Sequence, residues 1–312
     1  MKYEFIVALT GPTASGKTQA AMALADRYPI SLISMDSAMV YRGMDIGTAK
    51  PSPEELEQYP HALIDVRSPH ETYSVAEFVD DADAQARRIL GEGRIPMLVG
   101  GSMLYLKAFR EGIAPMPAAD QAVRLRLADE ARRDGTEALY RRLQKLDPQA
   151  ASRIHPNNFS RIQRALEVIA LSGAPISEHW VNAKDVSERL GVRLLEFGIE
   201  PESRAALHAR IESRLNDMLT AGFIGEVAEL KSRDGMHVDL PAMRAVGYRQ
   251  VWEHLDGLTS REEMRQKALA ATRQLAKRQL TWMRGWPQLL TMTGESGTAL
   301  AAQIVAKTEL TD

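Results

Sequence analysis

Gly11-Pro12-Thr13-Ala14-Ser15-Gly16-Lys17-Thr18 follows the apolar run Phe5-Ile6-Val7-Ala8-Leu9 after one residue, Thr10, and leads into the helix-forming segment from Gln19 to Ala25. These eight residues match the pattern G-x-x-x-x-G-K-[ST], in which a strand ends in a loop that enters a helix. Such a loop turns consecutive backbone N–H groups towards one place, beside the positive end of the helix dipole. A plain Gly-containing turn between a strand and a helix is the alternative. The agreement of the motif with the preceding strand and the following helix favours a phosphate-binding loop.

The loop predicts a ligand class and leaves the reaction open. Lys17 would place a charge on the terminal phosphates, and the Thr18 hydroxyl would reach a Mg²⁺ ion that bridges them. We expect all eight residues, from Gly11 to Thr18, to surround the phosphates. Kinases, hydrolases and transferases that expel pyrophosphate can all use such a loop.

Composition excludes several classes of protein. The chain has 312 residues, 45% of them apolar, and no cysteine, so disulfides, thiolate zinc sites and a cysteine nucleophile are ruled out. No stretch approaches the roughly 20 apolar residues of a membrane span. The chain begins Met1-Lys2-Tyr3-Glu4 and enters a strand at once, so we expect no cleavable signal and a cytoplasmic location.

Short apolar runs alternate with helical patterns over the first hundred residues, which predicts βαβ units and a parallel sheet. The expected fold is α/β, a P-loop NTPase-like parallel sheet flanked by helices, with an all-helical insertion. We assign residues 1–113 to the first part of the core, 114–190 to the insertion and 191–312 to completion of the core. The candidate strands are Phe5 to Leu9, Ser31 to Met35, Ala62 to Val66, Pro96 to Val99, Val192 to Ile199 and Leu289 to Met292.

Helix signals are clearest in four places. Ser74 and Glu77 form a capping-box pattern for a helix that reaches Leu90. The insertion holds helical patterns at Gln121 to Arg133, Thr136 to Leu146 and Asn158 to Leu171, with Gly135 and Gly173 as stops. Further helices are expected from Arg204 to the low 280s, and a terminal helix near Thr298 to Lys307.

Basic side chains concentrate in two segments although the formal net charge is only −2. Cations outnumber anions from Arg124 to Arg164, and residues 261 to 284 hold seven Lys or Arg against two Asp or Glu. The run Lys277-Arg278-Gln279-Leu280-Thr281-Trp282-Met283-Arg284-Gly285-Trp286 places cations beside two Trp, which suits phosphates and stacked bases. The alternative is that these charges lie on solvated helix faces. For the first segment this alternative is as acceptable as a role in binding nucleic acid.

Asp36 follows the second candidate strand, whose carboxyl end opens on the same crevice as the phosphate loop. A carboxylate there can act as a general base, whereas an N-cap of the following turn is the structural alternative.

A longer pattern separates these readings. The segment from Asp36 to Pro51, DSAMVYRGMDIGTAKP, closely resembles the signature of the tRNA dimethylallyltransferases, also called isopentenyltransferases. The resemblance reaches to about Trp286 and includes the segments 11–18, 98–105, 153–157, 161–167, 244–250 and 272–279.

The resemblance implies transfer of the dimethylallyl group of dimethylallyl diphosphate to N6 of the adenosine immediately 3′ to the anticodon of tRNA. Asp36 would accept the amine proton, and Lys17 with Mg²⁺ at Thr18 would stabilise the leaving diphosphate. Ser102 matches a hydroxyl residue near the amine, and Arg214 an arginine that could pair with the diphosphate. The insertion would clamp the anticodon arm, and we expect a monomer.

By the same resemblance, a set of residues is expected to contact tRNA: Asp36, Ser37, Ala38, Met39, Ser102, Arg124, Arg161, Arg164, Arg244, Gly247, Tyr248, Arg249, Lys277, Arg278, Gln279 and Trp282. Ser102 stands where Thr is usual in the family, and it keeps the hydroxyl. Met39 stands where Gln is frequent and lacks the amide that could touch a base, so Met39 is the weaker candidate for a specific RNA contact. Arginines on amphipathic helices are also commonly solvated or salt-bridged surface groups.

Two other functions are compatible with the phosphate loop. A small-molecule or nucleotide kinase would turn over a nucleoside triphosphate and ignore RNA, and it leaves the run from Lys277 to Trp286 unexplained. A non-catalytic RNA-binding switch would bind RNA tightly whether or not Asp36 is present.

Overall fold

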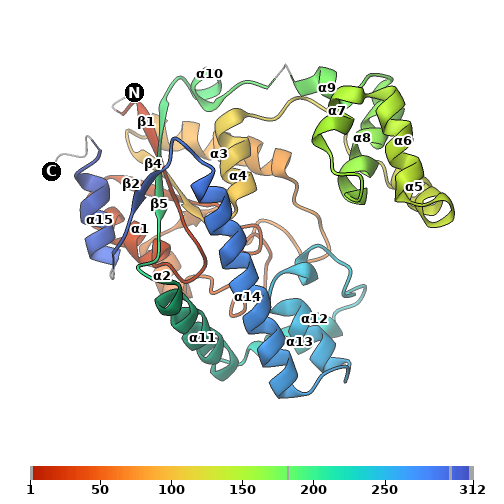
Figure 1. The fold of residues 1–312 in the computed structure, drawn as a ribbon. Coiled ribbons are helices and arrows are strands. Elements are labelled where there is room, and N and C mark those ends of the chain that lie inside the picture. Colours follow the sequence, from red (N-terminus) through yellow and green to blue (C-terminus); the bar gives the residue numbers. More distant parts are fainter. Residues whose placement is uncertain (1–2, 181–182, 295–296, 309–312) are drawn as a thin grey trace. The chain divides into compact units, whose positions relative to one another are not determined.

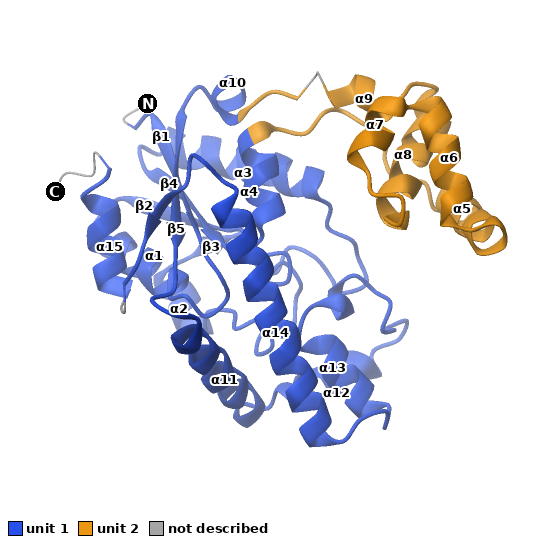
Figure 2. Cartoon of the chain, viewed as in Figure 1, with its two compact units in different colours: residues 1–110, 186–312 blue, residues 111–185 orange. Residues whose placement is uncertain are grey.

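The computed structural model describes residues 3–180, 183–294 and 297–308. Met1 and Lys2, part of the expected approach to the first strand, lie outside the described residues. The described chain divides into two compact units, one of residues 1–110 with 186–312 and one of residues 111–185 (Figure 2).

A six-stranded parallel sheet in the order β3-β2-β4-β1-β5-β6 forms the centre of the first unit (Figure 1). Its strands are β1 Phe5–Thr10, β2 Ile30–Ser34, β3 His61–Ala62, β4 Ile95–Gly100, β5 Arg193–Ile199 and β6 Leu290–Met292. Helices flank this sheet, and the predicted α/β fold with a parallel sheet core is confirmed.

Strand β1 is buried on both faces, which is why its sequence is a continuous apolar run. Phe5, Val7 and Leu9 pack in one core with helices α1 (Lys17–Ala25) and α15 (Gly297–Val305). The alternate residues Ile6 and Ala8 point to the opposite face. Helix α3 (Val75–Gly91) packs against β2 and β4 and begins with the predicted capping box, in which Ser74 and Glu77 exchange hydrogen bonds.

The remaining helices of the first unit are α2 Pro53–Gln58, α4 Met103–Glu111, α10 Val186–Leu190, α11 Arg204–Thr220, α12 Phe223–Ser232, α13 Tyr248–Leu255 and α14 Arg261–Arg284. Helices α12 and α13 form an apolar core with Val40, Tyr41 and Met44, which lie in the segment after β2. This second core holds the segment carrying Asp36 to Pro51 against the C-terminal half of the unit.

The described residues of the second unit form only helices: α5 Gln121–Asp134, α6 Thr136–Leu146, α7 Pro148–Arg153, α8 Phe159–Ser172 and α9 Ile176–His179. Leu127, Leu143, Ile162 and Val168 belong to its own hydrophobic core. Gly135 and Gly173 end α5 and α8 with positive φ, where glycine is favoured.

Two elements end at least two residues earlier than the sequence predicts. Strand β3 stops at Ala62 because Leu63 and Asp65 adopt positive φ, which turns the chain out of the sheet before Val66. Helix α15 ends at Val305, two residues before the predicted Lys307.

Candidate active site

The phosphate loop lies between β1 and α1, as its sequence predicts. Ala14 has φ 61° and Gly16 has φ 85°, so the backbone alternates in handedness through the loop. Alternation of this kind turns neighbouring N–H groups towards a common side and forms an anion-binding nest. The strained, left-handed Ala14 is typical of a functional loop rather than of an ordinary turn.

Lys17 folds back over this loop. Its Nζ donates hydrogen bonds to the carbonyl oxygens of Pro12 at 2.7 Å and Gly11 at 3.0 Å. Burial lowers the pKa of Lys17 to about 7, the positive Arg214 acts in the same direction, and Asp36 opposes both. Lys17, Arg214 and Asp36 line the same cavity, so they share one electrostatic environment.

Arg214 reaches this environment from α11, and the chain around Thr48 holds it in place. Its guanidinium donates to the carbonyl oxygen of Thr48 at 3.1 Å. Burial lowers the pKa of Arg214 and Asp36 opposes the shift, although an arginine retains its charge. The loop that carries Thr48 is fixed in turn by Glu226, whose carboxylate accepts the backbone N–H groups of Asp45, Ile46 and Gly47.

Asp36 stands just beyond the end of β2, and its geometry is compatible with both roles considered for it. Its Oδ1 accepts the N–H of Ala38 at 2.9 Å and that of Met39 at 3.4 Å, so this oxygen caps the following turn. Among the described residues no hydrogen bond is made to Oδ2. One carboxylate oxygen thus fixes the side chain while the other is available for a proton.

Ser102 lies beside Asp36 because two loops approach closely. Its Oγ accepts the N–H of Ser37 at 3.0 Å. The approach depends on Gly100, since a Cβ at that position would lie 1.9 Å from the carbonyl oxygen of Met35. This contact places Ser102 in the same pocket as Asp36, and its expected position near the target amine stays a prediction.

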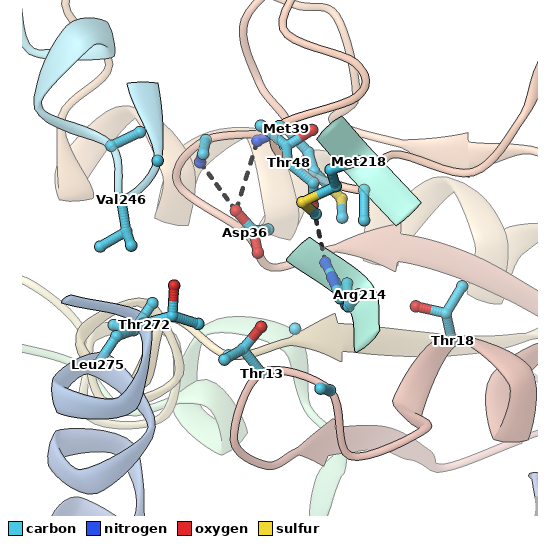
Figure 3. Close-up of a pocket in the computed structure, with 18 of the residues that line it drawn as sticks. Thr13, Thr18, Asp36, Met39, Thr48, Arg214, Met218, Val246, Thr272 and Leu275 are labelled. Carbon is cyan, nitrogen blue, oxygen red and sulfur yellow. Dashed lines mark hydrogen bonds between the residues drawn. The ribbon is translucent and has the colours of Figure 1, made fainter. Parts of the chain in front are cut away.

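Two adjoining hollows meet at Asp36. The first, here called the loop cavity, is lined by Thr13, Lys17, Thr18 and Arg214 and by an apolar wall of Met39, Leu215, Met218, Val246 and Leu275 (Figure 3). The second, the outer pocket, is lined by Ser37, Ser102, Leu104, Arg244, Arg278 and Trp282. Both hollows share seven lining residues: Asp36, Ala38, Gly101, Ala245, Val246, Leu275 and Gln279.

Residues expected to contact tRNA fall into two groups in the first unit. Ser37, Arg244, Arg249, Lys277, Arg278 and Trp282 are exposed. Tyr248 and Gln279 are buried instead, at 0% and 7% exposure, and both have partners inside the protein. The hydroxyl of Tyr248 donates to Glu226 at 2.6 Å, and Tyr248 lines the loop cavity beside Gly247.

The arginines of the second unit also differ from one another. Arg124 and Arg164 both pair with the fully buried carboxylate of Glu167, at 2.8 Å and 2.7 Å. Arg161 is exposed on the same helix as Arg164. In this structure the first two arginines stabilise the helical unit, and Arg161 is open to solvent.

Sequence reasoning missed Glu226, the carbonyl of Thr48 and the apolar wall. The local sequence pattern would place Glu226 on an exposed helix face. Nothing in the neighbouring residues indicates that its carboxylate binds three backbone amides of a loop about 180 residues earlier in the chain. Residues 3–180, 183–294 and 297–308 contain no cluster of three or more His, Cys, Asp or Glu side chains that could hold a metal ion. Over the same residues, no helix is both long and apolar enough to span a membrane.

Comparison with known proteins agrees with this geometry. Residues 39–286 match the model of the IPP transferase family. A tRNA dimethylallyltransferase from Chromohalobacter salexigens is 55% identical over 278 residues, which cover 89% of this chain and 88% of that protein. A tRNA dimethylallyltransferase 2 from Hahella chejuensis is 51% identical, with 91% and 89% covered.

Solved structures give the same result. A tRNA isopentenylpyrophosphate transferase from Bacillus halodurans superposes with a TM-score of 0.69 at 37% identity, covering 97% of this chain and 96% of the other. A eukaryotic dimethylallyltransferase that acts on tRNA has a TM-score of 0.79 at 24% identity, covering 97% and 77%, and supports the fold. The family match and the identities together establish that this chain belongs to the IPP transferase family.

Proposed function

We propose that this chain transfers the dimethylallyl group of dimethylallyl diphosphate to N6 of the adenosine immediately 3′ to the anticodon of tRNA and releases diphosphate. The observation that carries the proposal is the meeting of two hollows at Asp36, one lined by a phosphate loop and the other by exposed Arg and Trp side chains. A donor diphosphate fits the first, and an extruded base fits the second.

In the proposed reaction the adenine N6 attacks C1 of the allyl group while the bond from C1 to the diphosphate oxygen breaks. The bonding electrons leave with the diphosphate, and the N6 proton passes to Asp36. An exocyclic adenine amine is a weak nucleophile, because its lone pair is delocalised into the ring. A carboxylate held beside it by two backbone amides removes the proton as the new bond forms.

The leaving diphosphate gains negative charge as the bond breaks. Lys17, Arg214 and the amides of the phosphate loop surround the space where this charge develops. Preorganised donors of this kind stabilise the transition state most strongly in a site that excludes water. Met39, Val246 and Leu275 would cover the allyl group, so that water does not compete with the amine.

The donor set fits a Mg²⁺ ion held mainly by the substrate. Thr18 contributes a hydroxyl at the start of α1, and the described residues offer no carboxylate cluster beside it. Mg²⁺ commonly takes one or two protein ligands, with phosphate oxygens and water for the rest. When bound, the ion would neutralise part of the diphosphate charge.

The outer pocket supplies the acceptor side. Arg278 and Arg244 would contact tRNA phosphates, and Trp282 would stack on a base. Arg161 would contact the anticodon arm from the helical unit. Cytoplasmic location and action as a monomer stay predictions.

The test compares two anticodon stem-loops that differ in one base. The purified chain, Mg²⁺ and dimethylallyl diphosphate should release diphosphate with a stem-loop that has adenosine 3′ to the anticodon, and not with its guanosine counterpart. Release with both or with neither would contradict the proposal. Turnover of ATP without RNA would favour a kinase, which the outer pocket gives no reason to expect.

A further inference from the structure

Gln279 joins the two loops that carry the reacting groups. Its Oε1 accepts the N–H of Thr13 in the phosphate loop at 2.9 Å, and its Nε2 donates to the carbonyl oxygen of Gly101 at 2.9 Å. The side chain is only 7% exposed. A single amide therefore connects α14 to both loops at the boundary between the loop cavity and the outer pocket.

The absence of a side chain at Gly101 leaves room for this contact. A Cβ added to Gly101 would lie 2.3 Å from Nε2 of Gln279, so the Gln279 side chain would have to move. The next residue is Ser102, and the residue before the pair, Gly100, abuts Met35. The bond from Gln279 thus acts on the turn that places Ser102 beside Asp36.

Each end of the Gln279 amide has a hydrogen-bond partner inside the protein. An RNA contact that replaced either of these bonds would leave the Thr13 N–H or the Gly101 carbonyl without this partner, which is unfavourable for a buried group. The neighbours on the same helix, Arg278 and Trp282, are exposed and line the outer pocket. RNA contact thus belongs to those side chains, and Gln279 needs another explanation.

We propose that Gln279 is a positioning residue that sets the spacing between the phosphate loop and the turn that carries Ser102. The proposal rests on the proposed function above. The side-chain oxygen of Gln279 holds the phosphate loop at Thr13, and its side-chain nitrogen holds the Ser102 turn at Gly101. Loss of either bond lets one reacting partner shift relative to the other, and a displacement of about 1 Å can reduce the rate by about a hundredfold.

The two bonds can be separated by substitution. Gln279→Met keeps the length of the side chain and removes both bonds. Gln279→Glu keeps an acceptor for the Thr13 N–H but brings an oxygen against the Gly101 carbonyl. Gln274→Met on the exposed face of the same helix is the matched control.

Steady-state kinetics, binding of tRNA and binding of inorganic diphosphate measured by calorimetry form the test. For Gln279→Met we expect kcat lower by roughly 10 to 100 fold, diphosphate binding several-fold weaker, and a tRNA Kd within twofold of the parent. For Gln279→Glu we expect diphosphate binding near that of the parent with kcat still reduced. Gln274→Met should match the parent in every measurement.

Three results would overturn the proposal. Parent-like kinetics of Gln279→Met would show that the bridge has no role. A weaker tRNA Kd as the main effect would make Gln279 an RNA contact, and equal losses in both Gln279 variants together with a lower Tm would make it a packing residue. Diphosphate binding needs no prenyl transfer, so failure of the proposed function, seen as an inactive parent chain, is distinguished from failure of this inference.

Discussion

Lys17 donates a hydrogen bond to the carbonyl oxygen of Pro12 at 2.7 Å, and both residues belong to the phosphate loop. The lysine is thus held by the loop rather than extended into open solvent. Burial lowers its pKa to about 7, so near neutral pH it is only partly protonated. Donor binding must change this state, because a diphosphate favours the charged lysine.

This relationship predicts proton uptake when the donor binds. With a free-enzyme pKa of about 7, Lys17 is mostly neutral at pH 8, and a bound diphosphate would raise that pKa. Donor binding at pH 8 should take up close to one proton, and affinity should weaken as pH rises above 7. Calorimetry in two buffers of different ionisation enthalpy measures the uptake. Lys17→Met should remove it, and an unchanged uptake in that variant would assign the proton to another group.

Asp36→Asn should separate the base from the cap. Asparagine retains an oxygen for the N–H groups of Ala38 and Met39, so the turn is preserved while the proton acceptor is lost. We expect kcat to fall by about 10² to 10⁴ fold with tRNA affinity nearly unchanged. Filter binding and single-turnover kinetics check both quantities. A matching loss of tRNA affinity would give Asp36 a structural role only.

Glu226→Gln should destabilise the loop from Asp45 to Thr48, which holds Arg214 through the Thr48 carbonyl. The carboxylate accepts three backbone N–H groups and the Tyr248 hydroxyl, and charge-assisted bonds of this kind contribute about 1.5 to 3 kcal/mol. The free energy of unfolding should fall by about 2 kcal/mol, measured by chemical denaturation, with a higher KM for the donor. Glu229→Gln, which alters an exposed ion pair with Arg233, should change stability by less than about 0.5 kcal/mol. Equal effects in the two variants would contradict the role of Glu226.

Arg278→Ala should lower the salt dependence of tRNA binding. Arg278 is exposed beside Trp282 at the outer pocket, and each phosphate contact adds about 0.7 to 0.9 to the slope of log K against log salt. Arg261→Ala, at the opposite end of α14, is the control and should leave the slope unchanged. The same slope in Arg278→Ala and the parent would place Arg278 outside the interface.

Glu167→Gln should weaken the helical unit. Burial acts to raise the pKa of Glu167, but hydrogen bonds from Arg124, Arg164 and the Asp120 amide outweigh it and hold the pKa below its usual value. We expect about 2 kcal/mol of lost stability at neutral pH. In the parent this contribution should disappear as pH falls through the lowered pKa, because protonated Glu167 no longer pairs. Glu137→Gln, in an exposed pair, is the control, and an equal loss there would contradict this account.

The sequence predicts most of what depends on local pattern. The phosphate loop, the strand before it and the helix after it are encoded in adjacent residues, and the capping box at Ser74 predicts the start of α3. For Ser102 the local pattern gives no signal, and its role near the amine is expected only from the resemblance to a family. Strand β3 was overestimated, because the positive φ values of Leu63 and Asp65 leave no signal in an apolar run.

Contacts between distant segments were beyond prediction. Gln279 stands in a basic, aromatic run that indicates an RNA surface, yet helix packing turns its amide inward to Thr13 and Gly101. Tyr248, which lines the loop cavity, meets Glu226 in the same way. Which face of a helix is buried depends on its neighbours in the fold, and composition alone does not determine it.

The most direct measurement uses dimethylallyl diphosphate labelled in the allyl group, unmodified tRNA, Mg²⁺ and the purified chain, followed by nucleoside analysis. The account predicts label in N6-dimethylallyladenosine at the single position 3′ to the anticodon, and almost none with Asp36→Asn. Unlabelled tRNA from a folded chain, together with hydrolysis or transfer of ATP phosphate, would contradict it.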